Sequence, residues 1–154
     1  MPRITRKKTA YKISEPLRRY LHEYGRVLDL PIQYRDLSRY SDAVTLYDKY
    51  NQDTLWVSLL YPPADLKHIH HALKKIYAIL RAGGDLTVME HLYVDRVDLC
   101  LYGNTNPFRV RIVNRINDNF DYFYIKHADA SRLFGLELEG LLSPNRISYV
   151  VHKE

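Results

Sequence analysis

The stretch Phe120-Asp-Tyr-Phe-Tyr-Ile-Lys-His127 decides the fold of this chain. Its apolar and aromatic residues predict a buried β-strand, and one lysine, Lys126, stands near the end of that strand. Two further strands are predicted before it, at about 91–102 and 108–116, and residues typical of turns separate all three. Because the turns are tight, we expect the three strands to form an antiparallel meander.

The two earlier strands of this meander are predicted to contain a bulge and a face rich in arginine. The alternation of apolar and polar residues breaks near Asp95 and Arg96, which predicts a bulge or bend. In the second strand, alternate residues face opposite sides of the sheet. One face is predicted to carry Phe108, Val110, Ile112 and Ile116, and the other Arg109, Arg111 and Arg115.

The residues after the meander predict a helix and then a fourth strand. The spacing of apolar residues over about 129–142 is helical, and Glu137 falls inside the apolar arc of that helix. Pro144 then interrupts the chain, and 146–152 again has the composition of a strand. We therefore expect an α+β fold, with 146–152 in the antiparallel sheet and the helix packed on it.

Upstream of the meander, the sequence predicts a helix–hairpin–helix extension over 14–84. Ser14 is a suitable N-cap for its first helix, the hairpin spans 42–61, and the second helix spans 66–81. The predicted organisation is a basic arm (1–13), the extension (14–84) and the sheet with its helix (85–154). We expect the last two to form one compact unit, since 154 residues correspond to about one domain.

The formal net charge of +5 resides in the N-terminal arm. Of 23 basic residues, five lie in the first twelve positions, and the remaining eighteen equal the eighteen acidic residues in number. These five are Arg3, Arg6, Lys7, Lys8 and Lys12. Such an arm is either a solvated, disordered terminus or an attachment to a polyanion, and in the second case we expect it to give most of the binding.

Other features restrict the class of protein. The single cysteine, Cys100, allows no disulfide within one chain, which is typical of a reducing compartment. No apolar run approaches the length of a membrane span, and no secretion signal is visible, so we expect a cytoplasmic protein. The cluster His68, His70 and His71 lacks the spacing of a known metal motif, and no metal site is predicted.

In the order of its elements, the segment from about 95 to 154 resembles the small, N-terminal lobe of an atypical protein-kinase-like fold. Tyr124-Ile-Lys126 is similar to the strand pattern of that family, in which two apolar residues precede a lysine. The turn at Gly103, Asn104 and Thr105 resembles the turn that covers the phosphates, with one glycine where the family has three. The resemblance covers about two-fifths of the chain.

The resemblance implies a nucleotide-binding module that is not catalytic by itself. Lys126 would contact the phosphates, Glu137 would position Lys126, and ATP with Mg²⁺ would bind only together with a large lobe. The catalytic loop and the Asp-Phe-Gly-like triplet of kinases do not occur in this sequence, so no catalytic residue is assigned. The chain would then be a fragment or N-terminal domain, with a large lobe or another chain as its partner. The alternative is that Lys126 and Glu137 form an ordinary structural ion pair or are solvated charges.

A second hypothesis comes from composition instead of resemblance. The chain contains fourteen tyrosines against four phenylalanines and one tryptophan, and tyrosine is enriched where proteins meet partners. Basic residues of the arm and of one sheet face would make this a tyrosine-rich module that binds RNA, another polyanion or a protein. The residues concerned are Arg3, Arg6, Lys7, Lys8, Arg109, Arg111 and Arg115.

Overall fold

The computed structural model describes residues 12–102, 106–127, 133, 136–137 and 149–152. The chain forms two compact units. The first contains Pro31–Lys126, and the second combines Lys7–Leu30 with His127–Glu154. The first unit is thus inserted, along the chain, between the two halves of the second.

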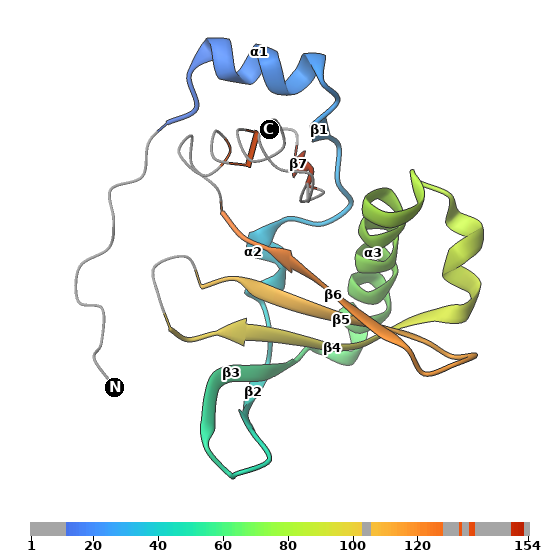
Figure 1. The fold of residues 1–154 in the computed structure, drawn as a ribbon. Coiled ribbons are helices and arrows are strands. Elements are labelled where there is room, and N and C mark those ends of the chain that lie inside the picture. Colours follow the sequence, from blue (N-terminus) through green and yellow to red (C-terminus); the bar gives the residue numbers. More distant parts are fainter. Residues whose placement is uncertain (1–11, 103–105, 128–132, 134–135, 138–148, 153–154) are drawn as a thin grey trace. The chain divides into compact units, whose positions relative to one another are not determined.

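The first unit is built on an open, five-stranded antiparallel sheet whose strands follow one another in sequence order (Figure 1). Its strands are β2 (Asp42–Tyr47), β3 (Asp53–Leu60), β4 (Leu92–Cys100), β5 (Phe108–Asn114) and β6 (Phe120–Ile125). The predicted meander is confirmed as β4, β5 and β6, including the bulge, since the register shifts between Val94 and Arg96. The α+β class is therefore confirmed.

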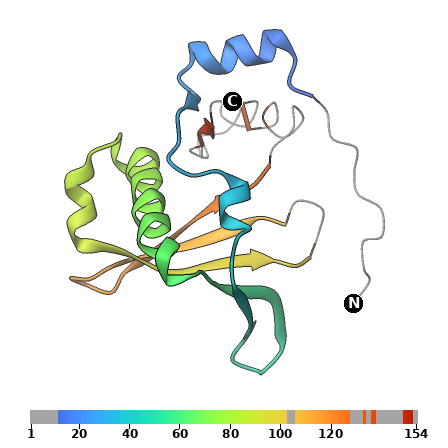
Figure 2. The same ribbon diagram turned by 180° about the vertical axis from the view of Figure 1, so that it is seen from behind.

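One face of this sheet is covered by helices α2 (Tyr34–Leu37) and α3 (Pro63–Ala82), as Figure 2 shows from behind. Apolar residues of the sheet and of α3 are buried between the layers, and each fully buried large side chain contributes about 1.5–3 kcal/mol. They include Val57, Val97, Phe108, Val110, Ile112 and Phe123 of the strands and Ile69, Leu73 and Ile76 of α3.

Two predicted boundaries in this unit are wrong, and one short helix was not predicted. Helix α3 begins at Pro63, three residues before the predicted start at 66, because proline fits the first turn of a helix, where its missing N–H costs nothing. Strand β5 ends at Asn114, whose side chain accepts a hydrogen bond from the amide of Ile116, so Ile116 lies exposed in a turn. The chain before β4 forms a 3₁₀ helix, η1 (Leu86–His91), where no helix was predicted.

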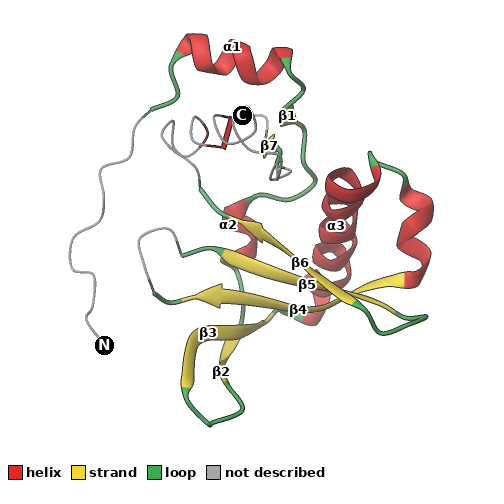
Figure 3. Ribbon diagram, viewed as in Figure 1, coloured by secondary structure: helices red, strands yellow, loops and turns green. Residues whose placement is uncertain are grey.

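The sheet also extends further than predicted. The hairpin of β2 and β3, assigned to the extension, belongs to the same sheet, because β3 pairs with β4 through Trp56–Ser58. The compact unit therefore crosses the predicted boundary between 84 and 85. Figure 3 shows these strands and the helices around them.

The second unit contains α1 (Glu15–Glu23), which the Ser14 side chain caps as predicted, and the two-stranded parallel sheet of β1 (Val27–Leu28) and β7 (Val151–His152). The prediction that 146–152 is the fourth strand of the antiparallel sheet is wrong for its described part. Residues 151–152 pair with β1, and the amide of Val151 donates to the carbonyl of Arg26 at 2.6 Å. A strand of two residues has too little apolar surface to specify its neighbour.

Of the predicted helix at 129–142, the structure describes residues 133, 136 and 137, and all three are helical. Leu133 and Glu137 are buried, as the predicted apolar arc requires. They belong to the second unit. Within the described part of the chain, no helix combines the length and the apolar character that crossing a membrane requires.

Candidate functional site

The face of the five-stranded sheet opposite α2 and α3 carries no helix of the described part of the first unit. Helix α3 is tied to the other face, because Tyr77 packs on Phe123 and donates a hydrogen bond to Asp121. Helix α2 lies on that same face, since Tyr34 packs against Phe108. We call the opposite side the arginine face, defined by Trp56, Arg96, Asp98, Arg109, Arg111, Phe120, Tyr122 and Tyr124.

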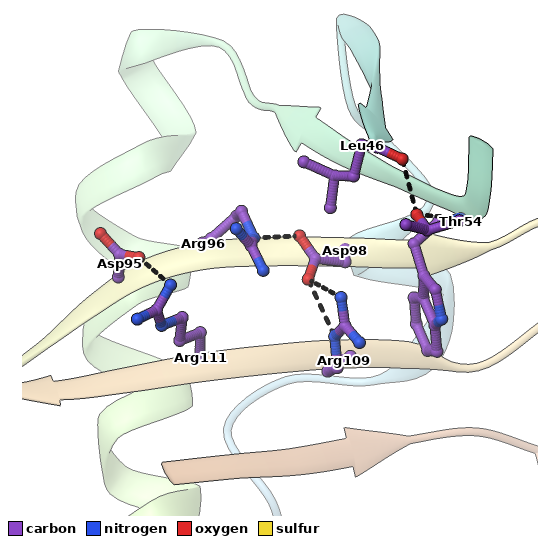
Figure 4. A network of polar contacts seen from close by, with 8 residues as sticks. Leu46, Thr54, Asp95, Arg96, Asp98, Arg109 and Arg111 are labelled. Atoms are coloured by element: carbon purple, nitrogen blue, oxygen red, sulfur yellow. Dashed lines mark hydrogen bonds and ion pairs between the residues drawn. The ribbon is translucent and has the colours of Figure 1, made fainter. Parts of the chain in front are cut away.

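Asp98 lies at the centre of the arginine face and is fully buried, with 0% of its surface exposed. The Nε of Arg96 donates to its Oδ1 at 2.7 Å, and the Nε of Arg109 donates to its Oδ2 at 2.9 Å (Figure 4). Buried charges are tolerated only when they are paired and hydrogen-bonded. Here the carboxylate of Asp98 accepts a charge-assisted hydrogen bond from each of two guanidinium groups. Asp98 therefore fixes the positions of both arginines.

Arg109 is held on its other sides by aromatic rings. Its guanidinium carbon lies 4.1 Å from the centre of the Trp56 ring and 5.1 Å from that of Tyr122. Contacts of a cation with an aromatic face are attractive because the ring face is electron-rich. The guanidinium group is therefore pre-oriented before any ligand arrives.

The guanidinium group of Arg111 has weaker polar contacts than those of Arg96 and Arg109. Its guanidinium carbon stacks 4.4 Å from the centre of the Phe120 ring, and its Nη1 lies 3.7 Å from a carboxylate oxygen of Asp95. Its Nε is buried and has no hydrogen-bond partner within the described part of the chain. Arg111 also lies directly opposite Arg96, and like charges in that position are destabilising.

Arg115 extends the charge into the turn after β5. It is exposed, and its guanidinium carbon lies 5.3 Å from the centre of the Tyr93 ring. Together with Arg96, Arg109 and Arg111 it gives four positive charges along β4, β5 and this turn, against the two negative charges of Asp95 and Asp98. These six side chains therefore carry a formal excess of two positive charges, one of which is Arg115 in the turn beyond β5.

The regular pairing of β3 with β4 places Trp56 on this face, because Trp56 lies opposite Cys100 and Ser58 lies opposite Asp98. The strand is kinked at the residue before Trp56. Leu55 has a φ of 66°, in the left-handed region that a leucine rarely adopts. The amide of Leu55 donates to the Asp53 side chain, and the Thr54 hydroxyl donates to the carbonyl of Leu46 at 2.6 Å. These bonds stabilise a bulge in the pairing of β3 with β2, where the register shifts between Thr45 and Tyr47. Bulges of this kind bend a strand.

The structure places the predicted site residues in three groups. Arg109 and Arg111 share one face of β5, as predicted, whereas Arg115 lies in the turn beyond the strand. The residues of the arm, Arg3, Arg6, Lys7 and Lys8, and those of the turn, Gly103, Asn104 and Thr105, lie outside the described residues. Lys126 and Glu137 fall in different units.

Lys126 follows the last residue of β6, at the end of a strand as predicted. Glu137 is bound by three side chains of its own unit. Arg26 donates from Nε to Oε1 at 2.8 Å, Tyr20 donates to Oε2 at 3.2 Å, and Tyr149 donates to Oε1. The predicted pairing of Lys126 with Glu137 stays a prediction.

The environment of Glu137 favours its charged form. Burial raises the pKa of this carboxyl group, but the hydrogen bonds from Tyr149, Arg26 and Tyr20 outweigh burial and bring the pKa below its ordinary value. Burial and the neighbouring carboxylate raise the pKa of the Tyr149 hydroxyl, which therefore stays a donor. Glu137 thus links α1, the start of β1 and the segment before β7.

Sequence reasoning assigned only Arg109 and Arg111 of the arginine face to a site and missed its six other members: Trp56, Arg96, Asp98, Phe120, Tyr122 and Tyr124. The signal for Asp98 was its position between the apolar residues Val97 and Leu99 in a strand whose partner carries Arg109. Trp56 gave no such signal, because its place depends on the pairing of β3 with β4 across the whole of α3. The described residues contain no group of three acidic, histidine or cysteine side chains that could hold a metal ion.

Comparison with known proteins gives no match: no protein-family model, no curated protein and no solved structure is similar to this chain.

Proposed function

We propose that this protein is a binding module and that the arginine face of its sheet binds a polyanion. The observation that carries the proposal is the set of guanidinium groups held on an open sheet face by Asp98 and by aromatic rings. Arg96 and Arg111 are placed directly opposite each other, which is unfavourable for folding. Local arrangements that oppose stability are expected at functional sites.

The arrangement suits anionic ligands for two reasons. Arginine presents a planar fork of N–H donors that matches phosphate and carboxylate groups. Because the side chains are already oriented, binding loses less conformational entropy than it would with free arginines. The basic arm at 1–13 would add long-range attraction, as its sequence predicts.

Replacing Arg111 by glutamine tests the proposal. We expect the affinity of the full chain for heparin to fall severalfold, and the slope of affinity against salt concentration to become less steep, because one phosphate-type contact is lost. Folding should change little, since the ion pair of Arg111 with Asp95 is long and partly exposed. The measurement is a fluorescence titration at several salt concentrations.

Arg81→Gln is the matched control. It removes the same charge from the helix-covered side of the same unit, where Arg81 pairs with Asp121 at 3.0 Å. A chain lacking residues 1–10 is titrated in parallel and separates the contribution of the arm. Equal losses for Arg111→Gln and Arg81→Gln would mean that only net charge matters, and the proposed face would be abandoned.

A second candidate function is the nucleotide-binding small lobe, with a large lobe or another chain as its partner. The favouring observation is the meander of β4, β5 and β6, which ends directly before Lys126. On this proposal Lys126→Met removes the charge that contacts the phosphates and abolishes binding of ATP with Mg²⁺ in the complete protein. The melting temperature should hardly change, because methionine retains the apolar stem.

Calorimetry and thermal unfolding on one sample measure both quantities. Lys126→Arg is the comparison, since it keeps a positive charge at the same place. Unchanged nucleotide binding together with a lowered melting temperature would assign Lys126 a structural role and end this second proposal.

A further inference from the structure

The arginine face also carries a row of aromatic side chains along β6. Phe120, Tyr122 and Tyr124 alternate with residues of the covered face, so all three project to the arginine face. Phe120 is 55% exposed and Tyr124 is 53% exposed, whereas Tyr122 lies between them in edge contact with Phe120. Neighbouring open rings on one sheet face form an exposed apolar patch of the kind that marks a binding site.

The guanidinium groups lie beside these rings in a regular order. Arg109 contacts Tyr122, Arg111 contacts Phe120, and Trp56 lies 6.4 Å from Tyr124 between ring centres. The ring centres of Phe120 and Tyr122, two residues apart on one face of β6, are separated by 5.6 Å. The positive charges of β5 and the open rings of β6 therefore lie side by side, in one line along the two strands.

We infer that this line binds single-stranded nucleic acid, with bases stacked on Phe120 and Tyr124 and the sugar–phosphate backbone along the arginines. The inference rests on the proposed function and specifies its ligand. A single strand presents flat bases and a repeating negative charge, and proteins bind it by combining aromatic stacking with a positive groove. A simple polyanion uses only the arginines and leaves the rings exposed to water.

The charge of the face argues against an apolar protein partner. Covering Phe120 and Tyr124 with apolar surface would also bury the guanidinium of Arg111, whose Nε already has no hydrogen-bond partner in the described part of the chain. Burying a charge without a partner is strongly unfavourable. A nucleic acid supplies an anion to the arginine and a ring to the aromatic side chain at the same time.

The test uses the full chain and two probes of equal length, oligothymidylate and an abasic deoxyribose-phosphate oligomer. Phe120→Leu and Tyr124→Leu remove the ring and keep an apolar side chain. Each is expected to weaken oligothymidylate binding by roughly five- to hundredfold. Tyr124→Leu, whose ring packs near Trp56, should leave the abasic oligomer unaffected, whereas Phe120→Leu also removes the ring on which Arg111 stacks and should weaken the abasic oligomer less than oligothymidylate. Tyr50→Leu, which removes a 71% exposed ring from the β2–β3 hairpin, should change neither affinity. Melting temperatures confirm that each variant is folded.

Different results separate the inference from the function on which it rests. Equal affinities for the two probes, with a loss in Arg111→Gln only, would leave polyanion binding intact and overturn base stacking. No effect of Arg111→Gln on either probe would overturn both. Binding of polyglutamate but not of oligothymidylate would assign the face to an acidic protein. Self-association abolished by Tyr124→Leu, without binding of oligothymidylate, would assign it to a second copy of the chain.

Discussion

Asp98→Asn is expected to lower the free energy of unfolding by about 3–5 kcal/mol, the usual cost of removing one member of a buried ion pair. The carboxylate is fully buried and accepts hydrogen bonds from Arg96 and Arg109. An asparagine of the same shape keeps one acceptor oxygen but adds an N–H₂ group that must face donors. Two guanidinium groups then lie side by side without a counter-charge.

Urea denaturation measures this change, and Trp56 is a suitable probe because it is the single tryptophan and stacks on Arg109. Asp95→Asn is the matched control, since its ion pair with Arg111 is 3.7 Å long and partly exposed and should contribute less than about 1 kcal/mol. Adding Arg96→Met to Asp98→Asn should restore part of the loss, because one unpaired charge is removed. Equal, small effects of the two aspartate variants would show that Asp98 does not organise the face.

Glu137→Gln is expected to destabilise the second unit by about 2–4 kcal/mol, because Arg26, Tyr20 and Tyr149 all donate to its buried carboxylate. A local reporter lies close by: the amide of Val151, which donates to the carbonyl of Arg26. Its protection from hydrogen exchange should fall by at least about thirtyfold, since 1.4 kcal/mol corresponds to a factor of ten.

Two comparisons make this test specific. Glu23→Gln, at the exposed end of α1, should leave the protection of Val151 unchanged. The amide of Cys100, which donates to the carbonyl of Pro107 in the first unit, should keep its protection in both variants. Loss of protection at both amides would mean that Glu137 stabilises the whole chain and not the second unit.

The same carboxylate predicts a pH dependence. Burial opposes its ionisation, but the three hydrogen bonds dominate and the pKa of Glu137 is lower in the folded chain than its ordinary value of 4.5. The stabilisation is therefore complete above about pH 4.5 and is lost as the pH falls through the lowered pKa. The difference in stability between the native chain and Glu137→Gln should shrink over that acidic range.

Local patterns predicted most of the sheet, and long-range pairing accounts for what they missed. Alternation and turn residues were sufficient for β4, β5 and β6 because each of these strands pairs with its neighbour in sequence. The pairing of β3 with β4 spans α3, and the pairing of β1 with β7 spans nearly the whole chain, so neither leaves a local signal.

The candidate site shows the same division. Arg109 and Arg111 were predicted together because both belong to one regular strand. Asp98 requires the register between β4 and β5, and Trp56 requires the pairing of β3 with β4, which α3 separates in the sequence. The residues that fix the arginines in place were therefore the ones that single-strand patterns could not reveal.

The insertion of the first unit within the second sets an order of events during synthesis. Arg26 and its acceptor Glu137 are 111 residues apart in the sequence. At ordinary translation speeds the ribosome needs roughly 6–22 s to cover that distance. During this interval Glu137, to which Tyr20 of α1 donates a hydrogen bond, has not yet been synthesised. All strands of the antiparallel sheet are synthesised meanwhile, in the order in which they pair. The sheet can thus be complete before the segment that finishes the second unit has left the ribosome.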